Sequence, residues 1–165
     1  MRRSAKFCKR VGRALCLPLP LRWRGQSGLG LHNLQQKIVK HLSPKGKGYL
    51  IIHAGANTIG SVHDIEWLRQ MEEIVYFVRL MYPNYRLIWS DMLRRAEWRH
   101  LPTDEAEKRR KRLQQRTRQL FYSEDGDVIR HLRINQDDSM LCHDNVHLSL
   151  MGQEWFLYDL WAYFA

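Results

Sequence analysis

An aspartate and two histidines lie close together near the C-terminus, in the stretch Cys142-His-Asp-Asn-Val-His-Leu-Ser-Leu-Met-Gly152. Asp144 precedes His147 by three residues. In a loop, a carboxylate at this spacing can accept the Nδ1 proton of the imidazole, which fixes the tautomer and leaves Nε2 free as a general base. An ordinary polar loop, with His143 and His147 as incidental neighbours, is the alternative interpretation.

A second candidate is Asn57, which lies in a turn of small residues after the apolar run at residues 49–53. In open α/β sheets, ligands bind beyond the carboxyl ends of the strands. The Asn57 amide can donate two hydrogen bonds, and its small neighbours leave room for a substrate atom to approach. The alternative is an asparagine that only shapes the turn. His53 either lines the same pocket or bonds to the backbone at the strand end.

Alternating strands and helices are needed to position these residues. Apolar runs predict strands over residues 19–23, 49–53, 85–89 and 127–130. Apolar residues spaced three and four apart predict helices over residues 29–42, 65–81, 103–122 and 150–164, with Asp64 as an N-cap and an irregular segment at 92–101. This order implies right-handed crossovers and a three-layer α/β/α sandwich with a parallel sheet.

The 165 residues are 44% hydrophobic and contain neither an internal repeat nor an apolar run long enough to span a bilayer. We therefore expect one globular domain over residues 19–165, preceded by a basic segment at 1–18 that includes a predicted helix over 5–17. Cys8, Cys16 and Cys142 lack the number and spacing of a disulfide framework or a zinc site. We expect no metal or cofactor, and an intracellular location, cytoplasmic or nuclear.

Three segments together resemble blocks of the SGNH (GDSL-type) hydrolase superfamily. They are Gly-Gln-Ser-Gly28, His-Ala-Gly-Ala-Asn57 and Asp144-x-x-His147-Leu-Ser, in the order and context of that family. The resemblance covers nearly the whole chain from about Leu19, and it is close in style to small SGNH domains of vertebrate transposon-related proteins. It implies a flavodoxin-like fold and the hydrolysis of an ester or acyl group.

By this resemblance, Gly28 and Asn57 form the oxyanion hole, His147 is the base and Asp144 orients it. Two positions depart mildly from the family pattern, since Ala56 precedes the asparagine and Thr58 follows it. The serious departure is the nucleophile, because the family serine follows a first, central strand. Ser4 has only three residues before it and Ser27 lies in the second block. We therefore expect a domain that lacks the first strand and the catalytic serine, with little esterase activity.

The net charge of +10 supports a competing interpretation, a basic module that binds nucleic acid or another protein. Its core is a run of five basic residues, Lys108, Arg109, Arg110, Lys111 and Arg112. Glu105 and Glu107 lie at helical spacing from part of this run, and no known nucleic-acid motif is present. The alternative is an ordinary solvated helix face.

Overall fold

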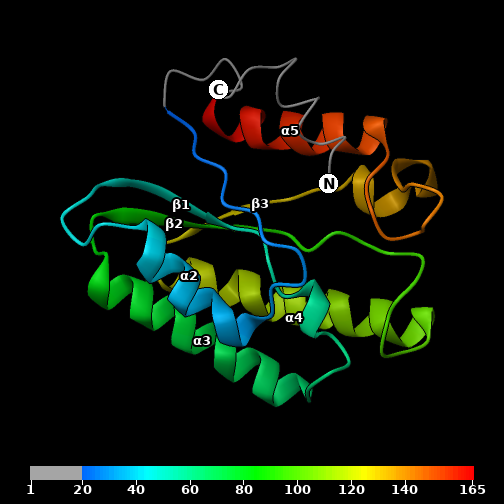
Figure 1. Ribbon diagram of the computed structural model, residues 1–165, viewed down its shortest axis with the longest axis horizontal. Helices are drawn as coiled ribbons and strands as arrows, with labels where there is room; N and C mark the ends of the chain where they lie inside the picture. The colour runs from blue at the N-terminus through cyan, green and yellow to red at the C-terminus, as the bar shows by residue number, and fades with distance from the viewer. Residues whose placement is uncertain (1–19) are drawn as a thin grey trace.

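A computed structural model describes residues 20–165, so the basic segment 1–18 and its predicted helix lie outside the described residues. The described part has three layers, with a central sheet between two sets of helices (Figure 1). One face of the sheet is covered by α2 (Leu34–His41), α3 (Asp64–Met81) and α4 (Thr103–Ser123), and the other by α5 (Leu150–Phe164). The predicted three-layer α/β architecture is confirmed.

The sheet of the described residues contains three parallel strands in the order β1 (Gly48–Ile52), β2 (Tyr85–Ser90) and β3 (Asp127–Ile129). Helix α3 connects β1 to β2, and α4 connects β2 to β3. Because all three strands run in the same direction, their carboxyl ends meet at one edge of the sheet. Residues that follow each strand are therefore brought together, however far apart they are in the sequence.

The larger core lies between the sheet and helices α2, α3 and α4. The inner face of α3 is buried there, with Trp67, Met71 and Val75 showing no exposed surface. These side chains pack in one cluster with Leu87 and Trp89 of β2. Each large side chain buried in this way stabilises the fold by about 1.5–3 kcal/mol, which explains why an 18-residue helix stays attached to the sheet.

The second core lies between the sheet and α5. Ile88 of β2 and Ile129 of β3 are buried there against Leu157 and Leu160, and Ile51 of β1 packs against the same cluster. Successive side chains of a strand alternate between faces, so the residues two positions further on share the α5 face. Those residues are His53, Ser90 and His131.

Three local predictions need correction. Pro20–Trp23 do not form a strand, because Pro20 has no N–H for a ladder, and Leu21 alone among them packs against a described core. The predicted helix 29–42 is shorter, a 3-10 turn followed by α2. Asp64 is the first residue of α3, and its N-cap is His63. The other helices and strands match their predicted ranges to within one or two residues.

Candidate active site

The turn after β1 holds Asn57 in a fixed place. Gly55 adopts a φ of 97°, the left-handed region that glycine reaches without strain. A Cβ at Gly55 would lie 2.5 Å from the ring of Trp67, so only glycine allows this approach. The Trp67 indole N–H donates to the Gly55 carbonyl at 3.1 Å and anchors the turn to α3. Asn57 follows in a short 3-10 turn.

The two predicted oxyanion-hole segments lie side by side. The Leu31 N–H donates to Thr58 Oγ1 at 3.2 Å, and Asn57 Nδ2 donates to the Leu29 carbonyl at 3.4 Å. Gly28, immediately before Leu29, has a φ of 70° and is exposed. The structure therefore brings the Gly28 and Asn57 segments together.

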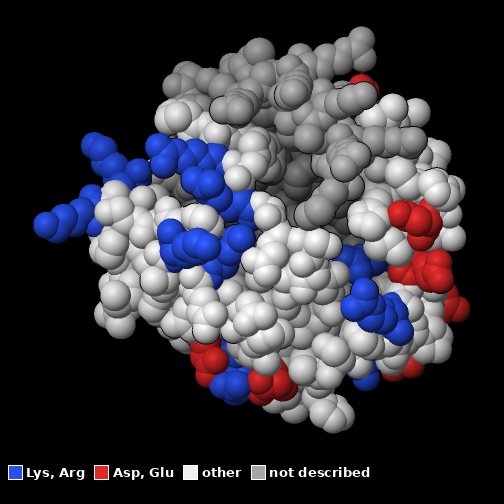
Figure 2. Space-filling model, viewed as in Figure 1, with Lys and Arg blue, Asp and Glu red and all other residues white. Residues whose placement is uncertain are grey.

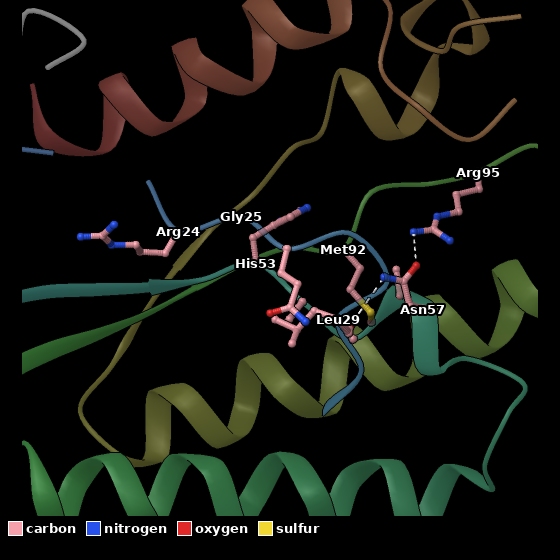
Figure 3. A pocket seen from close by; sticks show the side chains of 11 residues that line it. Arg24, Gly25, Leu29, His53, Asn57, Met92 and Arg95 are labelled. Carbon is pink, nitrogen blue, oxygen red and sulfur yellow. Dashed lines mark hydrogen bonds between the residues drawn. The ribbon is translucent and has the colours of Figure 1, made fainter. Parts of the chain in front are cut away.

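A pocket of about 250 Å³ opens beside Asn57 at the carboxyl edge of the sheet. Asn57 Oδ1 accepts a hydrogen bond from Arg95 at 3.0 Å, which aims the amide (Figure 3). The pKa of Arg95 is lowered, mainly because the guanidinium loses hydration. The described lining residues come from three segments: Arg24, Gly25, Gln26, Leu29, His53, Ala54, Gly55, Ala56, Asn57, Met92 and Arg95.

His147 and Asp144 form the predicted pair. His147 Nδ1 lies 2.6 Å from Asp144 Oδ2, while Asp144 Oδ1 accepts from the backbone N–H of His147 and Val146 at 2.9 and 3.0 Å. The backbone N–H of His147, followed by that of Val146 and by the imidazole, holds the pKa of Asp144 well below its usual value. Both side chains are exposed, His147 to 76% and Asp144 to 42%.

The His147 loop is attached to the pocket region without lining the pocket. The Ala96 N–H donates to the Asn145 carbonyl at 2.8 Å, next to Arg95. Neither His147 nor Asp144 is among the described lining residues. The structure therefore joins His147 to Asp144, and the Gly28 segment to the Asn57 segment, and the His147 pair lies outside the described lining of the pocket.

A further polar network lies beside the pocket, on the α5 side of the sheet. His53 Nδ1 lies 3.0 Å from Ser90 Oγ, which lies 2.8 Å from His131 Nε2. His131 Nδ1 in turn lies 2.8 Å from Asp159 Oδ2 of α5. Ser90 and His131 are fully buried. His53 lines the pocket, and its hydrogen bond runs to a side chain instead of the backbone.

Sequence reasoning missed His131 and Asp159 of this network, and the pocket residue Arg95. His131 and Asp159 come from different elements, and no local spacing joins them to Ser90. A signal was nevertheless available, because each of His53, Ser90 and His131 ends or follows a strand on the same face. Polar residues at such positions are candidates for a site in a parallel sheet.

The basic run on α4 is largely neutralised. Arg112 and Arg109 pair with Asp64, Arg109 also with Glu105, and Arg110 with Glu107. Arg110 is 2% exposed and donates to the Met92 carbonyl. On the face of the molecule drawn in Figure 2, Lys and Arg gather at one end and stand beside Asp and Glu at the other. The structure does not support nucleic-acid binding by this run.

Comparisons with known proteins place the fold. No family model and no curated protein matches the chain. A solved Streptococcus pneumonia protein assigned as a platelet activating factor matches with a TM-score of 0.78 at 18% identity, over 94% of this chain and 77% of that one. A GDSL-like lipase from Bacteroides thetaiotaomicron matches with a TM-score of 0.69 at 15% identity, over 86% and 73%.

An acetyl xylan esterase, AlAXEase, matches with a TM-score of 0.72 at 14% identity, over 99% of this chain and 89% of that chain. Within residues 20–165, no helix is long and apolar enough to cross a membrane, and no cluster of three or more His, Cys, Asp or Glu residues could hold a metal ion. The described part of the chain therefore has the α/β fold found in GDSL-like lipases and esterases.

Proposed function

We propose that the chain is an SGNH-type domain whose pocket binds and slowly hydrolyses an ester of a short acyl group. One observation carries this proposal, the Asn57 amide held at the wall of a 250 Å³ pocket by Arg95 and by the Leu29 carbonyl. A side-chain amide fixed in this way suits the negative oxygen that forms when a carbonyl is attacked. The acetyl esters named for AlAXEase make a short acyl group the first choice.

The Gly28 N–H and the Asn57 Nδ2 group are the proposed oxyanion donors. One hydrogen of Nδ2 is directed to the Leu29 carbonyl, and the second is the one that we assign to the ligand. A donor of this kind contributes about 10²–10³ in rate, because it stabilises the tetrahedral intermediate more than the substrate. The Arg95 guanidinium, bonded to Asn57 Oδ1, makes the amide a stronger donor.

His147, oriented by Asp144, is the proposed base that exchanges a proton with the leaving oxygen. The 2.6 Å contact to Asp144 leaves Nε2 of His147 as the nitrogen free for this exchange. This role requires the exposed loop to reach a substrate that extends out of the pocket, as an ester with a bulky alcohol would. The roles of His147 and Asp144 are proposed from the resemblance to the SGNH family.

Slow turnover is part of the proposal. The described residues that line the pocket include no serine, threonine or cysteine. An acyl-enzyme therefore has no nucleophile among them, and the oxyanion donors and base supply only residual catalysis. We also propose that the chain is related to the SGNH domains of transposon-related proteins and that it is located inside the cell. No observation favours nucleic-acid binding as a second function.

The test is the binding of ethyl methylphosphonate, an anion with the tetrahedral shape of the intermediate. An NMR titration measures this binding. We expect saturable shifts around the pocket, and an Asn57→Ala variant that binds about tenfold more weakly or worse. The matched control is Asn84→Ala, since Asn84 is an exposed asparagine in the turn between α3 and β2. Equal binding by the wild type and both variants would refute the pocket as an acyl site.

A further inference from the structure

Three adjacent strands place one side chain each in a continuous hydrogen-bonded row. The row runs from His53 through Ser90 to His131, with Nδ1–Oγ and Oγ–Nε2 distances of 3.0 and 2.8 Å. Asp159 of α5 closes it at 2.8 Å from His131 Nδ1. One end of the row lies in the pocket at His53, and the other ends at a carboxylate that is 20% exposed.

The protons of this row can be ordered in only one way when both histidines are neutral. The ionised Asp159 accepts a proton from His131 Nδ1, so His131 Nε2 must be an acceptor. Ser90 then donates its hydroxyl proton to Nε2 and accepts from His53 Nδ1–H. This order leaves His53 Nε2 as a lone-pair acceptor.

The surroundings keep the row intact. The Phe156 ring is tilted by 30° against that of His131, with centroids 4.7 Å apart, and meets that of His53 edge to face at 5.1 Å. Ser90 and His131 are fully buried, and hydrogen bonds are stronger in a medium of low dielectric constant. Only the His53 end lines the pocket that contains the Asn57 amide. A water molecule in the pocket would therefore have a base and an oxyanion donor among the residues around it.

We propose that His53 is the general base that activates a water molecule for attack on a short acyl ester, with Ser90, His131 and Asp159 as a relay that receives the proton. The inference rests on the proposed function, since the ester is the one that binds beside Asn57. His53 is the catalytic residue, and the three relay residues position and polarise it. His147 is left to exchange a proton with the leaving oxygen.

In the step, the water oxygen forms a bond to the carbonyl carbon, and the carbonyl π pair moves to the oxyanion at Asn57. A water proton passes to His53 Nε2, the Nδ1 proton of His53 passes to Ser90, and the Ser90 proton passes to His131 Nε2. Asp159 stabilises the resulting imidazolium. Collapse of the intermediate breaks the bond to the leaving oxygen and yields a carboxylic acid. The leaving oxygen takes one proton, from His147 or from solvent, to become the alcohol, and the row gives its extra proton back through His53 to solvent, so that both histidines are neutral again.

The surroundings of His53 favour its neutral form, which a base needs. His53 keeps exposed surface in the pocket, and loss of hydration among its close neighbours, followed by the charges of His131 and Arg95, lowers its pKa to about 4. Asp159, on the far side of His131, is the acidic group of the row and faces it from α5. Hydrolysis by His53 should therefore be constant above about pH 5 and fall towards pH 4, because protonation removes the acceptor.

The kinetic test uses p-nitrophenyl acetate, whose phenolate leaves without a proton, so that only activation of the water is measured. We expect His53→Asn to lower kcat by about 10²-fold with little change in KM, since general bases contribute about 10²–10⁴. Ser90→Ala should lower kcat less and should move the acid limb, and Ser90→Thr should restore both. The matched control is His143→Ala, an exposed histidine outside the row.

Two results would overturn the inference. A His53→Asn variant with wild-type kcat would do so, as would a wild type that binds ethyl methylphosphonate but hydrolyses p-nitrophenyl acetate no faster than buffer. The second result would leave the proposed ester site standing. A measurement on the wild type does not depend on the folding of any variant. In the wild type, ¹⁵N chemical shifts should show His53 as the Nδ1–H tautomer. A Nε2–H tautomer in the resting protein would contradict the relay.

Discussion

The molecule contains two aspartate–histidine pairs of nearly the same geometry in opposite surroundings. Asp144 and His147 meet at 2.6 Å in an exposed loop, and Asp159 and His131 meet at 2.8 Å beneath α5. His131 has no exposed surface, whereas His147 is 76% exposed. In the loop, the second ring nitrogen faces water. Under α5, the second nitrogen is bonded to Ser90, so the pair extends into a longer row.

This contrast shows that the contact distance of an aspartate–histidine pair does not determine its contribution to stability or to proton transfer. A polar group removed from water must find a partner in the protein, so Ser90 and His131, which are fully buried, depend on their neighbours in the row. The exposed pair can lose a member and replace it by water. We therefore expect the buried row to contribute to both stability and proton transfer, and the exposed pair to contribute little to stability.

The largest expected effect comes from removing the buried histidine. His131→Ala removes the acceptor of the Ser90 hydroxyl proton and the donor to Asp159 and opens a cavity, although Ser90 keeps its bond to His53, and we expect a loss of about 3 kcal/mol in the free energy of unfolding. Urea denaturation followed by circular dichroism measures it. A loss below about 1 kcal/mol would mean that the buried row is not a structural unit, and the contrast between the two pairs would fail.

A smaller effect is expected from Asp159→Asn, which preserves shape and an acceptor oxygen but removes the charge. The amide still accepts from His131 Nδ1, so we expect a loss of about 1–1.5 kcal/mol in the free energy of unfolding. The matched comparison is Asp144→Asn in the exposed pair, measured by the same denaturation. An equal loss at both sites would show that burial does not distinguish them.

Acid pH should act through His53. Because its pKa in the folded protein is lowered to about 4, the unfolded chain binds a proton that the folded protein does not, between about pH 6.5 and pH 4. The stability that His53 contributes is therefore complete above pH 6.5 and is lost as the pH falls through this window. Denaturation at several pH values should show a shallower fall in His53→Asn. An unchanged slope would contradict the lowered pKa.

The smallest effect is expected at the exposed pair. In His147→Ala, Asp144 Oδ1 keeps its bonds from the backbone N–H groups of residues 146 and 147, so the loop retains its turn. We expect the free energy of unfolding to change by no more than about 0.5 kcal/mol, as for most exposed substitutions. A loss near that of His131→Ala would mean that the loop is as integral to the fold as the buried row.

The helices and strands were readable from the sequence because burial imposes a period on it. The helix predicted over 150–164 has those bounds in the structure, and the apolar run at 49–53 gave β1 to within one residue. Pro20–Trp23 was read wrongly, since a short apolar segment resembles a strand even where no partner pairs with it.

In the candidate site, too, some contacts can be predicted from the sequence and others cannot. Asp144 and His147 lie three residues apart, so the sequence shows their contact directly. Ser90 lies 41 residues from His131, and His131 lies 28 residues from Asp159. Such contacts follow from the register of the sheet and the placement of α5, which no local pattern encodes. The roles assigned to Gly28, Asn57, His147 and Asp144 stay predictions.

The bond from Leu31 to Thr58 has a consequence for the rate of ligand binding. Because it is buried and joins the two loops that carry Gly28 and Asn57, these loops are ordered when the chain folds. A ligand that enters the pocket need not freeze them, so little conformational entropy is lost in the encounter. Association should then be limited by diffusion into the pocket instead of by loop closure, and Thr58→Val should slow it.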